Sequence, residues 1–167
     1  NEGFTDPREE SLPLRVIREL DSKDQTMDEP LEYKERRLLA GIPEGEEVEN
    51  SIPIFYNLDL FNAISFNKGC YAGQELVTRT LRRGIVRKRL FVVTGEAVGK
   101  NDAVTMNGES IGTVIAQSGS VGLSLLSTQT AANEKSQIID WMHQNSMNKF
   151  EVNGQQVALS LPPYIYR

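Results

Sequence analysis

Apolar and polar residues follow one another along the chain in patterns that divide it into three regions. In the first region, Leu12–Arg18 alternates apolar and charged residues with the period of a strand, and the polar stretch Asp21–Glu29 predicts a loop. Pro30 can open a helix, and Gly41 is a natural end for it. Residues 1–50 are therefore expected to form the last strand and helix of an α/β unit. The buried face of this helix is predicted to contain Leu31, Leu38 and Leu39.

The middle region, residues 51–84, is too apolar at its start to be a solvated linker. It is expected to pack between two domains. A helix should follow from about Tyr71 to Leu81, with one apolar face and a favourable outer pair of Glu75 and Arg79. The apolar residues at the start are Ile52, Ile54, Phe55, Leu58, Leu60, Phe61, Ile64 and Phe66.

From residue 85 onward, short β-type segments predominate. Two-residue hairpin turns are predicted at Asn107-Gly108 and at Asn153-Gly154. One helix interrupts the strands, beginning at Asn133 as its cap and ending near Asn145. A small antiparallel barrel closes so many short strands without leaving exposed edges. The predicted strands are Leu90–Thr94, Ala103–Met106, Ser110–Ala116, Val121–Leu126, Lys149–Val152 and Gln155–Leu159.

Composition narrows the classes of function. The 167 residues carry a net charge of -5, which argues against a general nucleic-acid-binding protein. A single cysteine excludes an internal disulfide framework and any iron–sulfur cluster held wholly by this chain's own thiolates. No apolar run approaches the length of a membrane span. These features favour a globular protein in a reducing compartment.

Charged residues are nevertheless concentrated in two places. Acidic residues crowd Glu44–Glu49, and six basic residues fall between Arg79 and Arg89. The basic cluster can be a solvated face, or it can attract an acidic partner or the glutamate tail of a folate. His143, the only histidine, is expected on the surface, since no metal-ligand spacing surrounds it. The basic residues are Arg79, Arg82, Arg83, Arg87, Lys88 and Arg89.

The stretch with the clearest chemical meaning is Lys68-Gly69-Cys70-Tyr71-Ala72-Gly73-Gln74-Glu75. It places the only cysteine between glycines at the expected start of a helix. Helix N-terminal N–H groups and a nearby ammonium stabilise a thiolate, and glycines let a ligand approach the backbone. A lone cysteine is also often a small buried hydrophobe, so a structural role stays open at this point.

This octet, with the surrounding Asn57–Phe91, resembles the KGC-motif, YgfZ-like family of the glycine-cleavage T-protein (GcvT) superfamily. That family includes mitochondrial iron–sulfur cluster assembly factors. Weaker matches lie in family order at Asp6-Pro7-Arg8 and at Arg36–Gly45. The resemblance covers most of the chain. Because family members are expected to carry a large N-terminal part with the folate-site framework, this chain is expected to be a C-terminal fragment.

The resemblance implies an α+β fold class: the end of a ferredoxin-like α/β domain (1–50), a connecting segment with the motif (51–84) and an antiparallel β-barrel domain (85–167). It implies that Cys70 acts as a thiolate and as a transient iron–sulfur ligand shared with a partner, and that no stable cluster forms on this chain alone. Tetrahydrofolate is the small molecule that it suggests. The implied cofactor-binding residues are Asp6, Arg8, Lys68, Gly69, Tyr71, Gly73, Gln74 and Glu75.

The same resemblance suggests iron–sulfur scaffold or A-type carrier proteins as partners, and the mitochondrial matrix as location, with the bacterial cytoplasm as the alternative. The competing function is a tetrahydrofolate-dependent aminomethyltransferase. Two features of the sequence differ from T-proteins and count against this function. Cys70 occupies the position at which T-proteins share an acidic residue, and Ile54 and Phe55 occupy positions at which many relatives carry a glutamate. A barrel-based interaction module with a structural cysteine is the third hypothesis.

Overall fold

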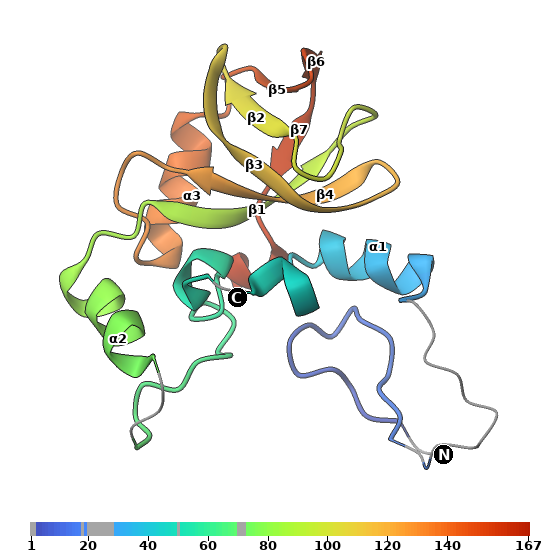
Figure 1. Cartoon of the computed structure of the whole chain (residues 1–167), viewed down its shortest axis with the longest axis vertical. Coiled ribbons are helices and arrows are strands. Elements are labelled where there is room, and N and C mark those ends of the chain that lie inside the picture. Colours follow the sequence, from blue (N-terminus) through green and yellow to red (C-terminus); the bar gives the residue numbers. More distant parts are fainter. Residues whose placement is uncertain (1–2, 18, 20–28, 50, 70–72) are drawn as a thin grey trace.

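The computed structural model describes residues 3–17, 19, 29–49, 51–69 and 73–167. It combines helices and strands, as the predicted α+β class requires (Figure 1). The helices are α1 (Leu31–Leu39), α2 (Gln74–Arg83) and α3 (Lys135–Gln144). The strands are β1 (Lys88–Thr94), β2 (Ala103–Met106), β3 (Glu109–Ser118), β4 (Val121–Ser127), β5 (Phe150–Val152), β6 (Gln155–Gln156) and β7 (Ala158–Ser160).

The seven strands form one antiparallel sheet in the order β6-β5-β2-β3-β4-β1-β7, which curls into a nearly closed barrel (Figure 1). Only Val157 separates the two edge strands along the chain. The predicted barrel is thus confirmed. The prediction of one strand over Gln155–Leu159 was wrong, because β6 pairs with β5 whereas β7 crosses to β1.

Both predicted hairpin turns are present. Asn107 and Gly108 have φ values of +52° and +88°, and Asn153 and Gly154 have +52° and +75°. Two consecutive residues with positive φ make a turn whose twist matches that of the flanking strands. Asparagine and glycine are the residues that adopt this conformation most readily, so the local sequence fixes both hairpins.

The barrel core is apolar and is closed on one side by α3. Ile138 and Trp141 are buried, and the Trp141 ring lies 5.1 Å from that of Phe91, measured between centroids. This confirms the predicted core face of α3. The helix is capped by Glu134 rather than by Asn133, whose side chain instead accepts a hydrogen bond from the Val86 N–H.

The first region departs most from the prediction. The expected strand Leu12–Arg18 is absent from the described residues, where a single bridge joins Phe4 to Arg15. No neighbouring described strand can extend this pairing, and Ile17 is 87% exposed.

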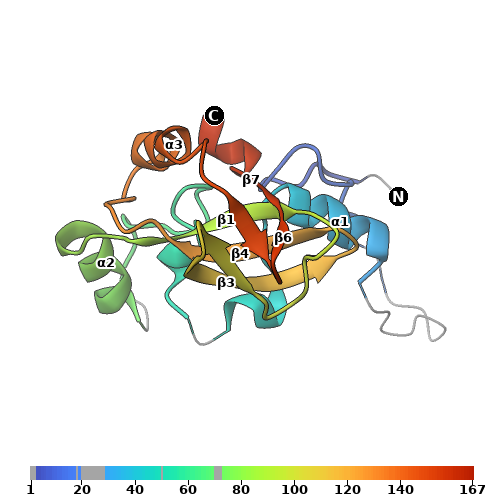
Figure 2. The same cartoon turned by 90° about the horizontal axis from the view of Figure 1, so that it is seen from above.

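Helix α1 forms after Pro30 as predicted and packs on β3 and β4 (Figures 1 and 2). Leu38 is buried, but Leu31 and Leu39 are exposed, because one helix lying on a barrel buries only one stripe. The helix ends at Leu39, and Gly41 follows with φ +71°, where a Cβ atom would lie 2.4 Å from the Pro162 ring. Glycine is therefore required there by conformation and by space.

The connecting segment packs as predicted. Ile54 is fully buried with Val77 and Val86, and none of the eight apolar residues named above is exposed. Buried Asn57, with φ +60°, donates its amide to the Leu90 carbonyl and the Tyr164 hydroxyl, and Tyr164 donates to the Gly41 carbonyl. These bonds join the connecting segment, the barrel and the end of α1. No described helix is long and apolar enough to cross a membrane.

Candidate functional site

The motif predicted to carry the chemistry lies at the end of the connecting segment, and its last residues, Gln74 and Glu75, begin α2. Lys68 and Gly69 are exposed, and a Cβ atom at Gly69 or Gly73 would meet nothing within 4 Å. Gly73 caps the helix with φ +83°, so the described helix starts at Gln74, later than the expected Tyr71. Cys70 and Tyr71 lie outside the described residues, and their roles stay predictions. The space beside the two described glycines is therefore open.

Helix α2 holds the second half of the motif against the rest of the protein. Val77 is buried against Ile54 and Val86, and Leu81 packs beside them. Gln74 is half-buried, whereas the Glu75 side chain is exposed and has no described hydrogen-bond partner. The predicted outer pair of Glu75 and Arg79 was therefore wrong, because the two side chains form no ion pair among the described residues.

A buried ion pair fixes the connecting segment to the barrel. The Arg89 guanidinium is fully buried and donates to both Asp59 carboxylate oxygens, at 2.7 and 3.0 Å, and to the carbonyl of Ile54. It also donates to the carbonyls of Ala132 and Asn133. The sequence placed Arg89 in the surface basic cluster, and this was wrong. Position 89 faces the barrel interior, where a charge is tolerated because all its donors are satisfied.

Asn133 continues this connection to α2. Its side-chain amide donates to the carbonyls of Leu81 and Gly84 at the C-terminal end of the helix. A chain of hydrogen bonds thus runs from the Asp59–Arg89 pair to the helix that follows the cysteine. The motif is presented on an element anchored to the barrel, which is what a precisely placed reactive side chain requires.

Asp6 and Arg8, the other predicted site residues, form a second polar cluster. The Arg8 guanidinium donates to both carboxylate oxygens of Asp6, at 3.0 and 2.7 Å, and also pairs with Glu44. Arg15 donates to the same Asp6 carboxylate at 2.6 Å. Hydrogen bonds from Arg8 and Arg15 hold the pKa of Asp6 far below its ordinary value, although burial opposes the shift. Asp6 is therefore an anion that keeps two arginines in place.

Residues that sequence reasoning did not identify complete this cluster. Arg37 on α1 is 1% exposed and donates to Glu29, Glu47 and the Ile42 carbonyl. Burial alone would lower the pKa of Arg37, but hydrogen bonds to Glu29 and Glu47 outweigh it and raise the pKa. Burial likewise opposes the lowered pKa of Glu44, which results from its bonds to Arg8 and Tyr33.

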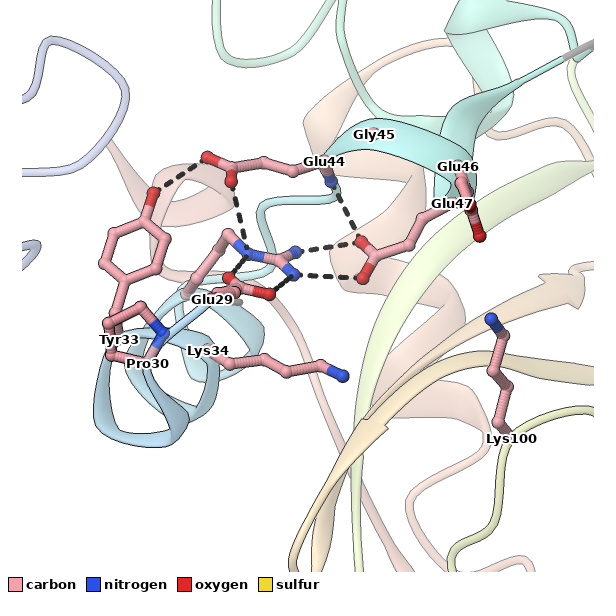
Figure 3. A pocket seen from close by; sticks show the side chains of 10 residues that line it. Glu29, Pro30, Tyr33, Lys34, Glu44, Gly45, Glu46, Glu47 and Lys100 are labelled. Atoms are coloured by element: carbon pink, nitrogen blue, oxygen red, sulfur yellow. Dashed lines mark hydrogen bonds and ion pairs between the residues drawn. The ribbon is translucent and has the colours of Figure 1, made fainter. Parts of the chain in front are cut away.

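Arg37 and its carboxylate partners Glu29 and Glu47 line an open pocket of about 530 Å³ between α1, the turn after it and the β1–β2 loop (Figure 3). The floor of the pocket is internally satisfied, because the Arg37 guanidinium makes five hydrogen bonds and has five N–H groups. It has no donor left for a ligand. The bonds of Arg37 therefore stabilise the fold, and the remaining cations of the lining are Lys34 and Lys100.

The structure does not bring the two predicted clusters together. The Asp6–Arg8 segment lies beside α1, whereas Lys68–Gly69 and α2 lie on the opposite side of the molecule (Figure 1). His143 is exposed, as predicted. The described part of the chain contains no group of three or more histidine, cysteine or acidic side chains that could hold a metal ion.

Similarity to known proteins agrees with the predicted family and with the barrel. Residues 87–165 match the family model of the CAF17 C-terminal beta-barrel domain. The chain is 43% identical over 100 residues to the mitochondrial iron-sulfur cluster assembly factor IBA57 homolog of Dictyostelium discoideum, an alignment that covers 53% of this chain and 24% of the relative.

Two further relatives carry the same name. Identity to the human protein is 39% over 105 residues, covering 57% of this chain and 30% of the relative. Identity to the Coccidioides immitis homolog is 30% over 178 residues, an alignment that covers 80% of this chain and 42% of the relative. The chain therefore spans less than half the length of these relatives. Their names confirm the predicted mitochondrial localisation.

Proposed function

Because this chain belongs to the GcvT-like family of the mitochondrial IBA57 proteins, we propose that it acts in the maturation of iron–sulfur proteins, with Cys70 as a transient ligand of the cluster in transit. The observation that carries the proposal is the chain's single cysteine, which the sequence places between two glycines just before a barrel-anchored helix. Thiolates are the ligands that iron–sulfur clusters require.

The number of thiolates determines the kind of role. One cysteine supplies one iron–sulfur bond, and a stable cluster needs several. Cys70 therefore forms its bond to iron as a donor thiolate dissociates, and it releases the iron when an acceptor thiolate arrives. The iron oxidation state does not change, and the donor takes up the proton that Cys70 loses. The remaining ligands come from scaffold or carrier proteins, which are the proposed partners.

Binding of tetrahydrofolate, which the resemblance suggested, stays a prediction, and one described residue counts against it. Ile54, at a place where many relatives carry a glutamate, is fully buried against Val77 and Val86 and presents no polar group to a ligand. No step is assigned to folate, and no described residue favours the aminomethyltransferase alternative.

The proposal is tested by Cys70→Ser in the full-length gene product, expressed in cells that lack the native protein. Serine keeps the size of the side chain but removes the soft ligand. We expect the activity of four-iron, four-sulfur client enzymes to fall by a factor on the order of ten or more at normal protein abundance. The matched control is Ser65→Ala, an exposed polar position in the same segment, which should retain full activity. Full rescue by an abundant Cys70→Ser protein contradicts the thiolate role.

A further inference from the structure

The outer surface of α2 and the chain that follows it carries charges that the rest of the structure does not neutralise. Four cations are exposed there, and none forms a side-chain hydrogen bond or ion pair with a described residue. Two apolar side chains between them, Leu76 and Ile85, are 55% and 57% exposed. We call this surface the α2 basic face. It consists of Leu76, Arg79, Arg82, Ile85, Arg87 and Lys88.

The helical period explains why these side chains share one side of α2. Val77 and Leu81, four residues apart, form the inner stripe against the connecting segment. Leu76, Arg79 and Arg82, at intervals of three, therefore form the outer stripe, with Glu75 at its start as the only acidic side chain of α2. Figures 1 and 2 both show α2 standing away from the barrel, so no described element covers the outer stripe.

The contrast with other arginines shows that this surface is unusual within the chain. Arg8, Arg15, Arg36, Arg37, Arg89 and Arg167 all pair with carboxylates. The chain as a whole has a net charge of -5, so acidic side chains are in excess, yet they lie elsewhere. An uncompensated cationic patch attracts and orients an oppositely charged partner.

We propose that the α2 basic face docks a partner protein through an acidic surface that carries apolar side chains. This inference rests on the proposed function, because the donor or acceptor thiolates must reach the motif whose last residues begin α2. Arg79, Arg82, Arg87 and Lys88 attract the acidic surface, and Leu76 and Ile85 supply the apolar contacts that a docked interface buries. A protein is favoured over nucleic acid because exposed leucine and isoleucine side chains flank the cations. It is favoured over lipid because the partner must bring a thiolate to the motif beside this face.

The test measures binding of the full-length gene product to a fluorescent, helical peptide of alternating leucine and glutamate blocks. We expect the affinity to fall roughly tenfold between about 0.05 and about 0.3 M salt, since screening removes the attraction. The double variant Arg79→Gln, Arg82→Gln should weaken binding by roughly tenfold at low salt. The matched control is Lys34→Gln, Lys100→Gln, which removes two cations at the pocket beside α1 and should change the affinity less than twofold.

Equal loss in the two double variants overturns the proposal, because the effect would then reflect net charge alone. Tighter binding to anionic phospholipid vesicles or to an RNA oligonucleotide of equal charge also overturns it. In cells, the Arg79→Gln, Arg82→Gln protein should support client activity several-fold less well than the control variant. If Cys70→Ser abolishes client activity while the arginine variant retains it, the docking proposal fails and the proposed function stands. If Cys70→Ser is active but peptide binding depends on Arg79 and Arg82, the proposed function fails and the docking proposal stands.

Discussion

The β-barrel buries aliphatic and aromatic side chains within seven paired strands. The described residues between 3 and 49 bury only a few apolar side chains, Leu12, Leu38, Ala40 and Ile42, and add a network of arginines bonded to carboxylates. Within the described residues, strand pairing in this first region is reduced to the Phe4–Arg15 bridge. Apolar burial is almost independent of pH, whereas ion pairs depend on the ionisation of each partner. The two regions should therefore respond differently to mutation and to acid.

The largest effect is expected from a cavity in the barrel. Phe91 is fully buried and contacts Trp141, so Phe91→Ala should lower the free energy of unfolding by about 4 kcal/mol. Chemical denaturation followed by tryptophan fluorescence measures this loss, which should be the same at pH 5 and at pH 7. A loss below about 1 kcal/mol would show that the barrel core is not well packed around this ring.

A smaller effect is expected from the buried arginine of α1. Arg37→Met removes the cation that neutralises Glu29 and Glu47 and should cost about 3 kcal/mol, because two partly buried carboxylates lose their partner. Hydrogen exchange should show faster opening of residues 29–49 and little change in β1, β3 and β4. Equal loss of protection in the barrel would contradict the separation of the two regions.

Acid should distinguish the regions without any mutation. Asp6 and Glu44 have pKa values lowered from ordinary values of 3.8 and 4.5, so both favour the folded state while ionised. This contribution is complete above about pH 5 and decreases as the pH falls towards the lower folded pKa values. Hydrogen exchange corrected for intrinsic rates should show residues 3–15 losing protection before the barrel. Asp6→Asn should reduce this pH dependence, and an unchanged acid profile would exclude Asp6 as its source.

The smallest effect is expected next to Arg37. Arg36 forms an exposed pair with Glu32 four residues before it, so Arg36→Met should change the free energy of unfolding by less than about 0.5 kcal/mol. The comparison of two adjacent arginines, one buried and one exposed, isolates the contribution of burial. A cost similar to that of Arg37→Met, measured by the same denaturation, would refute the explanation based on buried carboxylates.

Local sequence signals were sufficient where a short segment determines its own conformation. Asn107-Gly108, Asn153-Gly154, Pro30 and Gly41 each require or favour one backbone geometry, and all four were placed correctly. The barrel followed from the density of such signals between strand-like segments. The split between β6 and β7 could not be predicted, because pairing with β5 or β1 depends on contacts distant in sequence.

Charged residues were the main source of error. Arg89 and Arg37 look like surface side chains in the sequence, and nothing in their immediate neighbours shows that Asp59, Glu29 and Glu47 will meet them in the folded chain. The high density of acidic residues around Glu44 was the one sequence feature that could have predicted a buried cation, because like charges at such density require cations nearby. The assignment of Cys70 and Tyr71 rests on the motif alone, since both lie outside the described residues.

The central claim, that Cys70 is a shared cluster ligand, is tested most directly by protein-bound iron and sulfide. The full-length gene product, wild type or Cys70→Ser, is incubated anaerobically with iron, sulfide and excess glutathione as the additional thiol, then passed through a desalting column. The account predicts that the wild type retains iron and sulfide with glutathione but not without it, and that Cys70→Ser retains neither. Equal retention by Cys70→Ser, or retention by the wild type without added thiol, would contradict it.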